Sequence, residues 1–238
     1  MSETFLDGRV KVTQPESGFR SGLDAVMLAA AVPAVTGNTV LELGAGAGTA
    51  SLCLAARVPG LSLTGVEIDP DLAALAARNA AANGADCKFV AADIFALAPE
   101  LKRDFGHVFA NPPFHGEGQS SPDSARARAL MDGGSLQDWL KLGLQRTVWG
   151  GSFTAILRAD RLNEALAALP DRGVCVFPLW PRWGEAAKRV IVQARKGSNA
   201  PFALLAGLVL HRPDGSWADE TEAVLRRGSA LALPGARL

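Results

Sequence analysis

The stretch TVLELGAGAGTASLCLAAR, residues 39–57, limits the possible folds of this chain more than any other part of the sequence. A short apolar run leads into three glycines at alternate positions, Gly44, Gly46 and Gly48, and an Ala/Leu-rich run follows them. Glycine adopts left-handed backbone conformations without strain and lets a ligand approach the main chain closely. A strand, a glycine turn and the start of a helix in this order are typical of nucleotide-binding α/β proteins.

Strand-like and helix-like runs continue to alternate as far as residue 169. We expect strands over residues 39–43, 61–68, 87–93, 107–111 and 152–157, and helices over 23–32, 49–57, 69–84 and 161–169. This alternation predicts a parallel sheet with helices on both faces. The strand-like runs 173–179, 189–195 and 202–210 have no helix between them and are expected to form an antiparallel end of the sheet. The polar segment 116–134 is expected to be a long loop.

The length of 238 residues and the hydrophobic share of 48% suit one large domain with a sizeable core. The sequence contains no evident repeat or linker. We expect this domain to consist of an N-terminal cap segment, residues 1–36, a core, residues 37–210, and a C-terminal tail, residues 211–238.

Composition excludes several classes of protein. Lysine and arginine total 24, as do aspartate and glutamate, so the net charge of zero neither indicates nor excludes a local RNA-binding face. The three cysteines are widely spaced without a CxxC pair, which argues against a zinc site or a disulfide framework and favours a reducing cytoplasm. No signal peptide opens the sequence, and the longest apolar runs are too short to span a bilayer. We therefore expect a soluble cytoplasmic protein without a metal or a membrane contact.

Two acidic residues lie beside the glycine turn. Glu67 follows Gly44 by 23 residues, close to the separation of about 20 at which an acidic side chain binds ribose hydroxyls. A plain turn with a surface glutamate is the alternative, and ligand binding is favoured over it. The G-x-G-x-G spacing differs from that of dinucleotide folds, and no Lys-Ser/Thr pair follows as in a P-loop. Glu42 disfavours a pyrophosphate and suits a cationic amino group, which S-adenosylmethionine (SAM) carries without any phosphate.

With Glu42 before G-x-G-x-G, residues 39 to about 210 resemble the class I SAM-dependent methyltransferases. The resemblance implies a Rossmann-like fold with a mostly parallel seven-stranded sheet, an antiparallel end and SAM as the cofactor. It also implies that Glu67 binds the ribose hydroxyls, that Asp93 hydrogen-bonds the adenine amine, and that Asn111 belongs to the cofactor site as well. Asp93 is in addition a candidate N-cap of a short helix over residues 94–101, and the two roles are compatible.

The sequence Asn111-Pro112-Pro113-Phe114 ends the fourth expected strand. It resembles the motif of methyltransferases that act on planar, conjugated nitrogens. The Asn111 side-chain oxygen and the Pro112 carbonyl would accept hydrogen bonds from the two N–H groups of such an amine and so free its lone pair. Phe114 would stack on the flat substrate, at about 1–3 kcal/mol per base. A strand that merely ends in prolines is the less favoured alternative.

Three longer segments narrow the resemblance. Residues 16–30, 123–128 and 177–197 together resemble the bacterial tRNA(Val) adenine-N6 methyltransferases, which implies RNA, and tRNA in particular, as the partner. His115 makes the motif NPPFH, which also resembles ribosomal RNA guanine-N2 methyltransferases. Those enzymes usually carry a duplicated N-terminal domain, and the short chain therefore favours tRNA. We expect Phe114 and His115 to contact the substrate.

Two further functions remain as alternatives. A protein glutamine N5-methyltransferase also uses an NPP motif but prefers tyrosine after it, and this chain contains no tyrosine. A SAM-binding module without catalysis would have no reason to keep acceptors aimed at an amine. The oligomeric state is left open.

Basic and aromatic residues give a weaker indication of RNA binding. Arg126 and Arg128 lie in the long loop. Further cations cluster toward the antiparallel end, at Arg182, Lys188, Arg189, Arg195 and Lys196. Ordinary solvated surface explains them about as well as an RNA face. For Trp180 and Trp183, on either side of Pro181, packing is favoured over base stacking.

Overall fold

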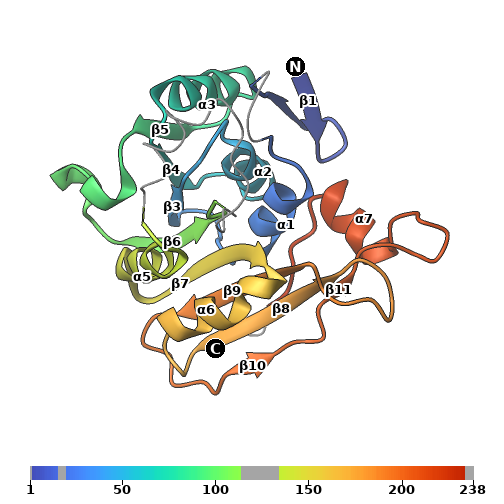
Figure 1. The fold of residues 1–238 in the computed structure, drawn as a ribbon. Helices are drawn as coiled ribbons and strands as arrows, with labels where there is room; N and C mark the ends of the chain where they lie inside the picture. The colour runs from blue at the N-terminus through green and yellow to red at the C-terminus, as the bar shows by residue number, and fades with distance from the viewer. Residues whose placement is uncertain (1, 16–19, 114–133, 234–238) are drawn as a thin grey trace, which may run out of the picture.

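A mostly parallel sheet forms the centre of the computed structural model, which describes residues 2–15, 20–113 and 134–233 (Figure 1). Five parallel strands lie in the order β5 (Cys87–Ala91), β4 (Ser62–Glu67), β3 (Thr39–Leu43), β6 (Phe105–Ala110) and β7 (Thr147–Arg158). Next come β9 (Arg189–Arg195), antiparallel to β7, and β8 (Val174–Trp180), antiparallel to β9. The expected class I fold, with its parallel sheet and antiparallel end, is confirmed. Two further short strands beside β8 extend the expected seven-stranded sheet to nine strands in the described part of the chain.

Helices cover both faces of this sheet. One face carries α1 (Leu23–Ala31), α2 (Thr49–Arg57) and α3 (Pro70–Ala82), with α7 (Asp219–Leu225) packed on α1. The other face carries α5 (Leu136–Gln145) and α6 (Leu162–Ala168). Among the described residues, no helix is both long and apolar enough to cross a membrane.

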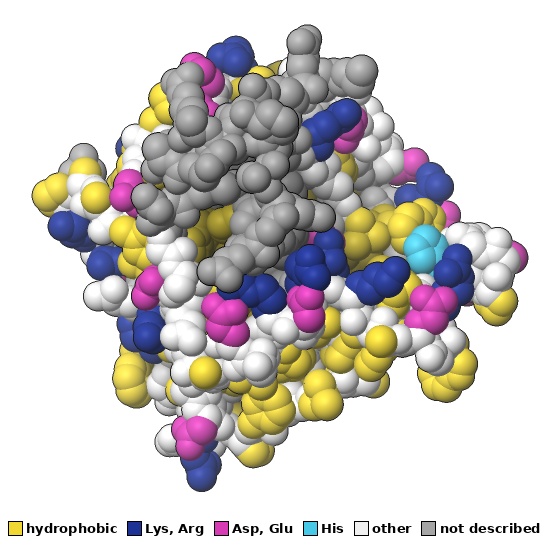
Figure 2. Space-filling view, in the orientation of Figure 1, with side chains coloured by type: hydrophobic (Ala, Val, Ile, Leu, Met, Phe, Trp, Pro, Cys, Tyr) yellow, Lys and Arg dark blue, Asp and Glu magenta, His cyan; other side chains and the backbone are white. Residues whose placement is uncertain are grey.

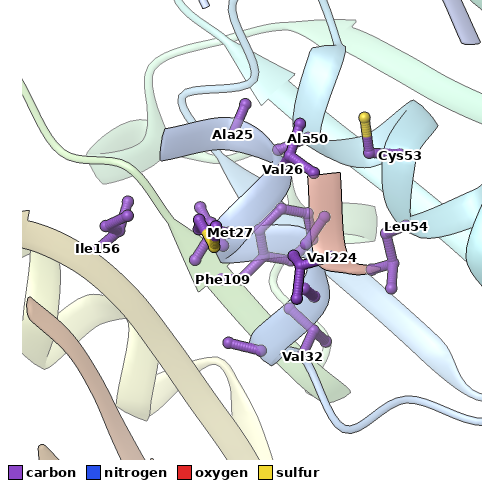
Figure 3. Packing of buried hydrophobic residues seen from close by; sticks show 14 of the residues in the cluster. Ala25, Val26, Met27, Val32, Ala50, Cys53, Leu54, Phe109, Ile156 and Val224 are labelled. Carbon is purple, nitrogen blue, oxygen red and sulfur yellow. The ribbon is translucent and has the colours of Figure 1, made fainter. Parts of the chain in front are cut away.

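Strand β6 shows why two helix layers form. Successive side chains of a strand point to opposite faces of the sheet. Val108 and Ala110 pack in the apolar cluster that contains Leu140 of α5. Phe109 packs in the other cluster, near Met27 of α1 and other residues of that face (Figure 3). Because the consecutive residues Val108, Phe109 and Ala110 are all apolar and buried, this part of β6 must be covered on both sides.

An N-terminal hairpin that the sequence did not predict packs beside α3. Its strands β1 (Ser2–Phe5) and β2 (Val10–Thr13) are antiparallel, and each has only four residues, too short for a clear periodic signal. The buried Asn79 of α3 accepts a hydrogen bond from the Thr13 N–H (2.9 Å) and donates to the Thr13 carbonyl (3.0 Å). Its amide also donates to the carbonyl of Ala47 in the glycine turn (2.9 Å). One side chain thus joins the hairpin to the turn.

The run over residues 202–210 does not form the expected antiparallel strand. It forms two short strands, β10 (Ala203–Leu204) and β11 (Leu208–Val209), both parallel to β8. Pro178 of β8 has no N–H to donate to a neighbouring strand. Gly207 lies against the Pro178 carbonyl with φ +79, so the chain bulges away between the two pieces.

One other expectation needs correction. The short helix over residues 94–101 is two 3₁₀ turns, η1 (Ile94–Ala96) and η2 (Pro99–Leu101), because Pro99 interrupts it. A third 3₁₀ turn, η3 (Ala159–Arg161), precedes α6. Helix α5 was not expected at all. The described part of the C-terminal tail is held in place, since Leu231 N–H donates to the Ala30 carbonyl (2.8 Å) and Leu233 is buried.

Candidate functional site

The glycine turn joins β3 to α2 at the carboxyl edge of the sheet. Gly44, Gly46 and Gly48 all have positive φ, at +70, +55 and +84. The N–H groups of Gly44 and Ala45 both donate to the Val66 carbonyl at 2.9 Å, which fixes the turn to β4. A Cβ added at Gly46 would meet no atom within 4 Å, so the turn is open on that side.

Glu67, the last residue of β4, lies directly beside this turn. One carboxylate oxygen accepts from the Gly46 N–H (2.7 Å) and the other from the Asp69 N–H (3.0 Å). An ionised carboxylate has about four acceptor positions, so each oxygen can still accept from a ligand hydroxyl. Asp69 itself caps α3, accepting from the N–H groups of Asp71 and Leu72 as expected of an N-cap.

Glu42 is buried beneath the turn, with its side chain directed at α2. One carboxyl oxygen accepts from the Ser51 N–H (3.2 Å) and from the Ser51 hydroxyl. Burial raises the pKa of Glu42 from 4.5 to about 8, the Ser51 hydrogen bonds oppose this rise, and the charge of Glu67 adds to it. The group therefore keeps its proton near neutral pH, and a cation placed beside it would favour the ionised form. A counter-charge role toward a ligand amine stays a prediction.

The raised pKa of Glu42 predicts how stability depends on pH. The carboxyl binds its proton more tightly in the folded chain, with a pKa of about 8, than in the unfolded chain, near 4.5. The free energy of unfolding contributed by this group is therefore lost as pH rises from 4.5 to 8. Glu42→Gln keeps a neutral acceptor for Ser51 and should exceed the unmodified chain in stability by roughly 2–4 kcal/mol at about pH 9.

Urea unfolding at about pH 5 and about pH 9 measures this effect. The difference between the two proteins should be small at the lower pH, where both carry a neutral side chain at position 42. A difference that is equal at both pH values would contradict the assignment.

Asp93 lies two residues beyond β5 and is half-buried. Its carboxylate accepts from the Phe95 N–H (2.8 Å), so the capping role toward η1 is confirmed. A contact with a ligand adenine stays a prediction. Parallel pairing brings Leu43 beside Val66 and Glu67 beside Ala91, so Asp93 emerges at the same edge as Glu67.

Asn111 joins this group of residues through strand register. Leu43 pairs with Ala110, so Gly44 and Asn111 leave the sheet side by side. Pro112 is buried and Pro113 is exposed. The Asn111 Oδ1 atom is one of four buried side-chain polar atoms in the described part of the chain that have no hydrogen-bond partner. Such a group costs about 1–3 kcal/mol, which suggests that it is kept for a donor supplied from outside the chain.

Phe114 and His115 lie outside the described residues, as do Arg126, Arg128 and nearly all of the segment 116–134. The predictions made for them therefore stay predictions. The residues that the structure does bring together at the carboxyl edge are the glycines, Glu67, Asp93 and Asn111.

Two aromatic residues at the site were missed by the sequence reasoning. The Trp139 indole of α5 covers Gly44 so closely that an added Cβ would lie 2.7 Å from its Cη2 atom. Trp139 also meets Phe95 edge to face, with ring centroids 6.4 Å apart. The sequence signal that could have predicted α5, and with it Trp139, was the pair Ser135 and Asp138. These two residues form a capping box at the start of the helix.

A hollow of about 460 Å³ lies beside α5 rather than over the glycine turn. Its walls come from η1, α5 and residues beside them, and include Phe95, Lys102, Asp138, Lys141 and Arg146. The described residues contain no group of three or more His, Cys, Asp or Glu side chains that could hold a metal ion.

A sheet of this strand order, with a glycine turn, an acidic residue and an Asn-Pro-Pro segment at its carboxyl edge, defines a class I SAM-dependent methyltransferase. The family model of the methyltransferase small domain matches residues 21–137. A tRNA1(Val) (adenine(37)-N6)-methyltransferase of Dickeya chrysanthemi is 35% identical, over 90% of this chain and 89% of its own length. The enzyme of the same name from Aeromonas hydrophila is 28% identical, over 87% of this chain and 89% of its own length. The chain belongs to the same methyltransferase family as these relatives.

Other relatives have different names. A ribosomal RNA small subunit methyltransferase C of Salmonella arizonae is 33% identical over 57% of this chain and 41% of its own length. A solved structure from Agrobacterium tumefaciens, described as a predicted O-methyltransferase, is 28% identical with a TM-score of 0.73, covering 88% of this chain and 99% of that one. The structure of the 16S rRNA N2 G1207 methyltransferase of T. thermophilus, in complex with AdoMet and guanosine, is 22% identical with a TM-score of 0.56. It covers 82% of this chain and 50% of its own chain, and at this identity it supports the fold alone.

Two observations of this structure fit SAM at the carboxyl edge. The glycine turn is open above Gly46, where a ligand can approach the backbone. The acidic side chain beside it, Glu67, is held in place by the Gly46 N–H and can accept hydrogen bonds from hydroxyl groups. The second feature does not suit a pyrophosphate, because the Glu67 carboxylate already accepts from the Gly46 N–H group that a phosphate oxygen would need.

Proposed function

We propose that this chain is a cytoplasmic RNA methyltransferase that methylates N6 of an adenine in tRNA. The observation that carries the proposal is the buried, unpaired Oδ1 atom of Asn111, in strand register with the glycine turn. The names of the two relatives that align over most of the chain, both tRNA1(Val) (adenine(37)-N6)-methyltransferases, support the same substrate.

An exocyclic base amine is a poor nucleophile because its lone pair is delocalised into the ring. Asn111 Oδ1 and the Pro112 carbonyl together provide hydrogen-bond acceptors for the two amine N–H groups. These two hydrogen bonds localise the lone pair on nitrogen. A hydroxyl has one proton and matches only one of them, so an amine suits this pair better. SAM supplies the electrophilic methyl group. Pro113 has no N–H that would compete for the acceptors.

The cofactor is assigned to the other residues of the carboxyl edge. Glu67 accepts from the ribose hydroxyls, and Asp93 accepts from the adenine amine while it caps η1. Gly44, Gly46 and Gly48 provide the open backbone, and Glu42 lies toward the amino group. For the target base we propose stacking on Phe114 and a contact with His115, whose ring nitrogens can donate or accept according to the tautomer.

A second candidate is guanine N2 in ribosomal RNA, which the Salmonella arizonae relative and the motif NPPFH favour. Asn111 and Pro112 would serve either base. The two bases differ at the ring N1 atom, which accepts in adenine and carries a proton in guanine. A protein glutamine amide also presents a planar nitrogen, and it remains the third candidate.

The test is to incubate the chain with labelled SAM and, separately, tRNA, ribosomal RNA and total cell protein. Nucleosides from the digested RNA are then identified by mass spectrometry. N6-methyladenosine from tRNA is the expected product. N2-methylguanosine from ribosomal RNA alone would replace the proposal with the second candidate, and label in protein alone with the third.

A further inference from the structure

The turn that connects β8 to β9 presents a tryptophan to solvent. The Glu185 N–H donates to the Arg182 carbonyl (3.2 Å), which closes a β-turn, and Gly184 takes the left-handed position with φ +80. Trp183 sits at the corner of this turn and is 90% exposed. Packing was expected for this residue, and that expectation is wrong. It is correct for Trp180, whose indole N–H donates to the Ala206 carbonyl (2.9 Å).

Sheet topology puts this turn at the same edge as Asn111. Strand β7 is parallel to β6, β9 is antiparallel to β7, and β8 is antiparallel to β9. The carboxyl end of β8 therefore lies at the edge where β6 ends. Three strand spacings separate β6 from β8, which is roughly 14 Å across the sheet. A substrate larger than a single nucleotide would span that distance.

The same topology divides the basic cluster seen in the sequence. Strand β9 begins with Arg189 at the carboxyl edge and ends with Arg195 at the opposite edge. Lys196 follows at that opposite edge, where its amine donates to the carbonyls of Gln145 and Thr147. Of this cluster, Arg182, Lys188 and Arg189 are therefore the members that can face a substrate held at Asn111.

Charge at the carboxyl edge is largely balanced. Arg182 pairs with Glu185, and Arg189 pairs with Asp24. Figure 2 shows the same pattern on one face of the molecule, where Asp or Glu lies beside several of the Lys and Arg side chains. Lys188 is exposed and forms no ion pair with another described residue. Long-range attraction is therefore weak here, and the exposed indole is the strongest feature that a nucleic acid would bind.

We propose that Trp183 stacks on an unpaired base of the RNA substrate near the methylated nucleotide but not next to it, with Lys188 beside a phosphate of the same strand. This rests on the proposed RNA methyltransferase function. Single-stranded RNA is recognised by splaying bases onto aromatic side chains, and a tryptophan fixed by a hydrogen-bonded turn loses little freedom on stacking. Lys188, which directly precedes β9 in the same connection, supplies the positive charge that a phosphate requires.

The chain offers a matched control. Trp149 is 80% exposed, but it lies near the start of β7, at the edge opposite Asn111, next to Gly197. Trp149→Ala also removes an exposed indole, but from the opposite edge of the sheet, where we expect no RNA contact. Trp183→Phe keeps an aromatic ring at the proposed stacking position.

The experiment measures methylation kinetics with tRNA, direct binding of the same tRNA by fluorescence anisotropy, and SAM affinity by calorimetry. Trp183→Ala should raise the KM and the Kd for tRNA about 10-fold or more, with kcat and SAM affinity unchanged. Trp183→Phe should restore most of the tRNA affinity, and Trp149→Ala should behave like the unmodified chain.

An active unmodified chain whose tRNA affinity is insensitive to Trp183→Ala, or equally sensitive to Trp149→Ala, would overturn this inference and leave the proposed function intact. An unmodified chain that methylates no RNA would overturn both.

Discussion

The Asn111→Ala variant is expected to lose turnover by a factor of about 10²–10³ while it binds SAM with nearly unchanged affinity. In the proposed mechanism Oδ1 accepts a hydrogen bond from the target amine, and this contact strengthens as the nitrogen becomes tetrahedral, so its loss falls on kcat. Single-turnover methylation of tRNA at saturating SAM measures the effect, with calorimetry for SAM binding. Retained turnover would remove Asn111 from the mechanism.

The same variant separates function from stability. In the folded chain Oδ1 is buried without a partner, so the alanine variant deletes an unsatisfied acceptor instead of breaking a hydrogen bond. We therefore expect its free energy of unfolding to be equal to that of the unmodified chain or greater. A loss of activity that came with marked destabilisation would point to a structural role. Asn111→Asp retains an acceptor and should keep more activity than Asn111→Ala.

Glu67→Ala is expected to weaken SAM binding about 100-fold or more. The variant removes the proposed acceptor for the ribose hydroxyls, and each hydrogen bond to a charged group contributes about 1.5–3 kcal/mol. It also deprives the Gly46 N–H of its partner, which loosens the glycine turn itself. Calorimetric titration with SAM measures the loss.

Glu67→Gln separates these two effects. The amide oxygen can still accept from the Gly46 N–H, while the charge toward the ribose is lost. We expect an affinity between those of the alanine variant and the unmodified chain. Equal SAM affinity in all three proteins would exclude Glu67 from the cofactor site.

Local signals made the first half of the sheet predictable. The expected strand 39–43 and helix 49–57 agree with β3 and α2 because glycines mark both boundaries of the turn between them. Asp69 and Pro70 mark the start of α3 equally well. In these places the residues that begin or end a helix or strand lie at its own boundaries, so the local sequence is enough to predict it.

Tertiary contacts decided the elements that the sequence did not predict. The bulge at Gly207 depends on Pro178 in a strand about thirty positions earlier, and neither residue alone reveals it. The candidate site divides in the same way. The types of Glu67, Asp93 and Asn111 pointed to their roles, but the position of Trp139 over Gly44 and the unpaired state of Asn111 Oδ1 depend on strand register and helix packing.

The amide of Asn79 makes the N-terminal hairpin and the glycine turn a single thermodynamic unit. It bonds both Thr13 and Ala47, so opening of β2 removes two of the hydrogen bonds that fix the amide holding the Ala47 carbonyl. A ligand that rigidifies the turn should in return restrain the hairpin. SAM should therefore slow hydrogen exchange at the Thr13 amide, although that amide lies on a different element from every proposed cofactor contact. Exchange at Thr13 that is indifferent to SAM would show that the two parts open independently.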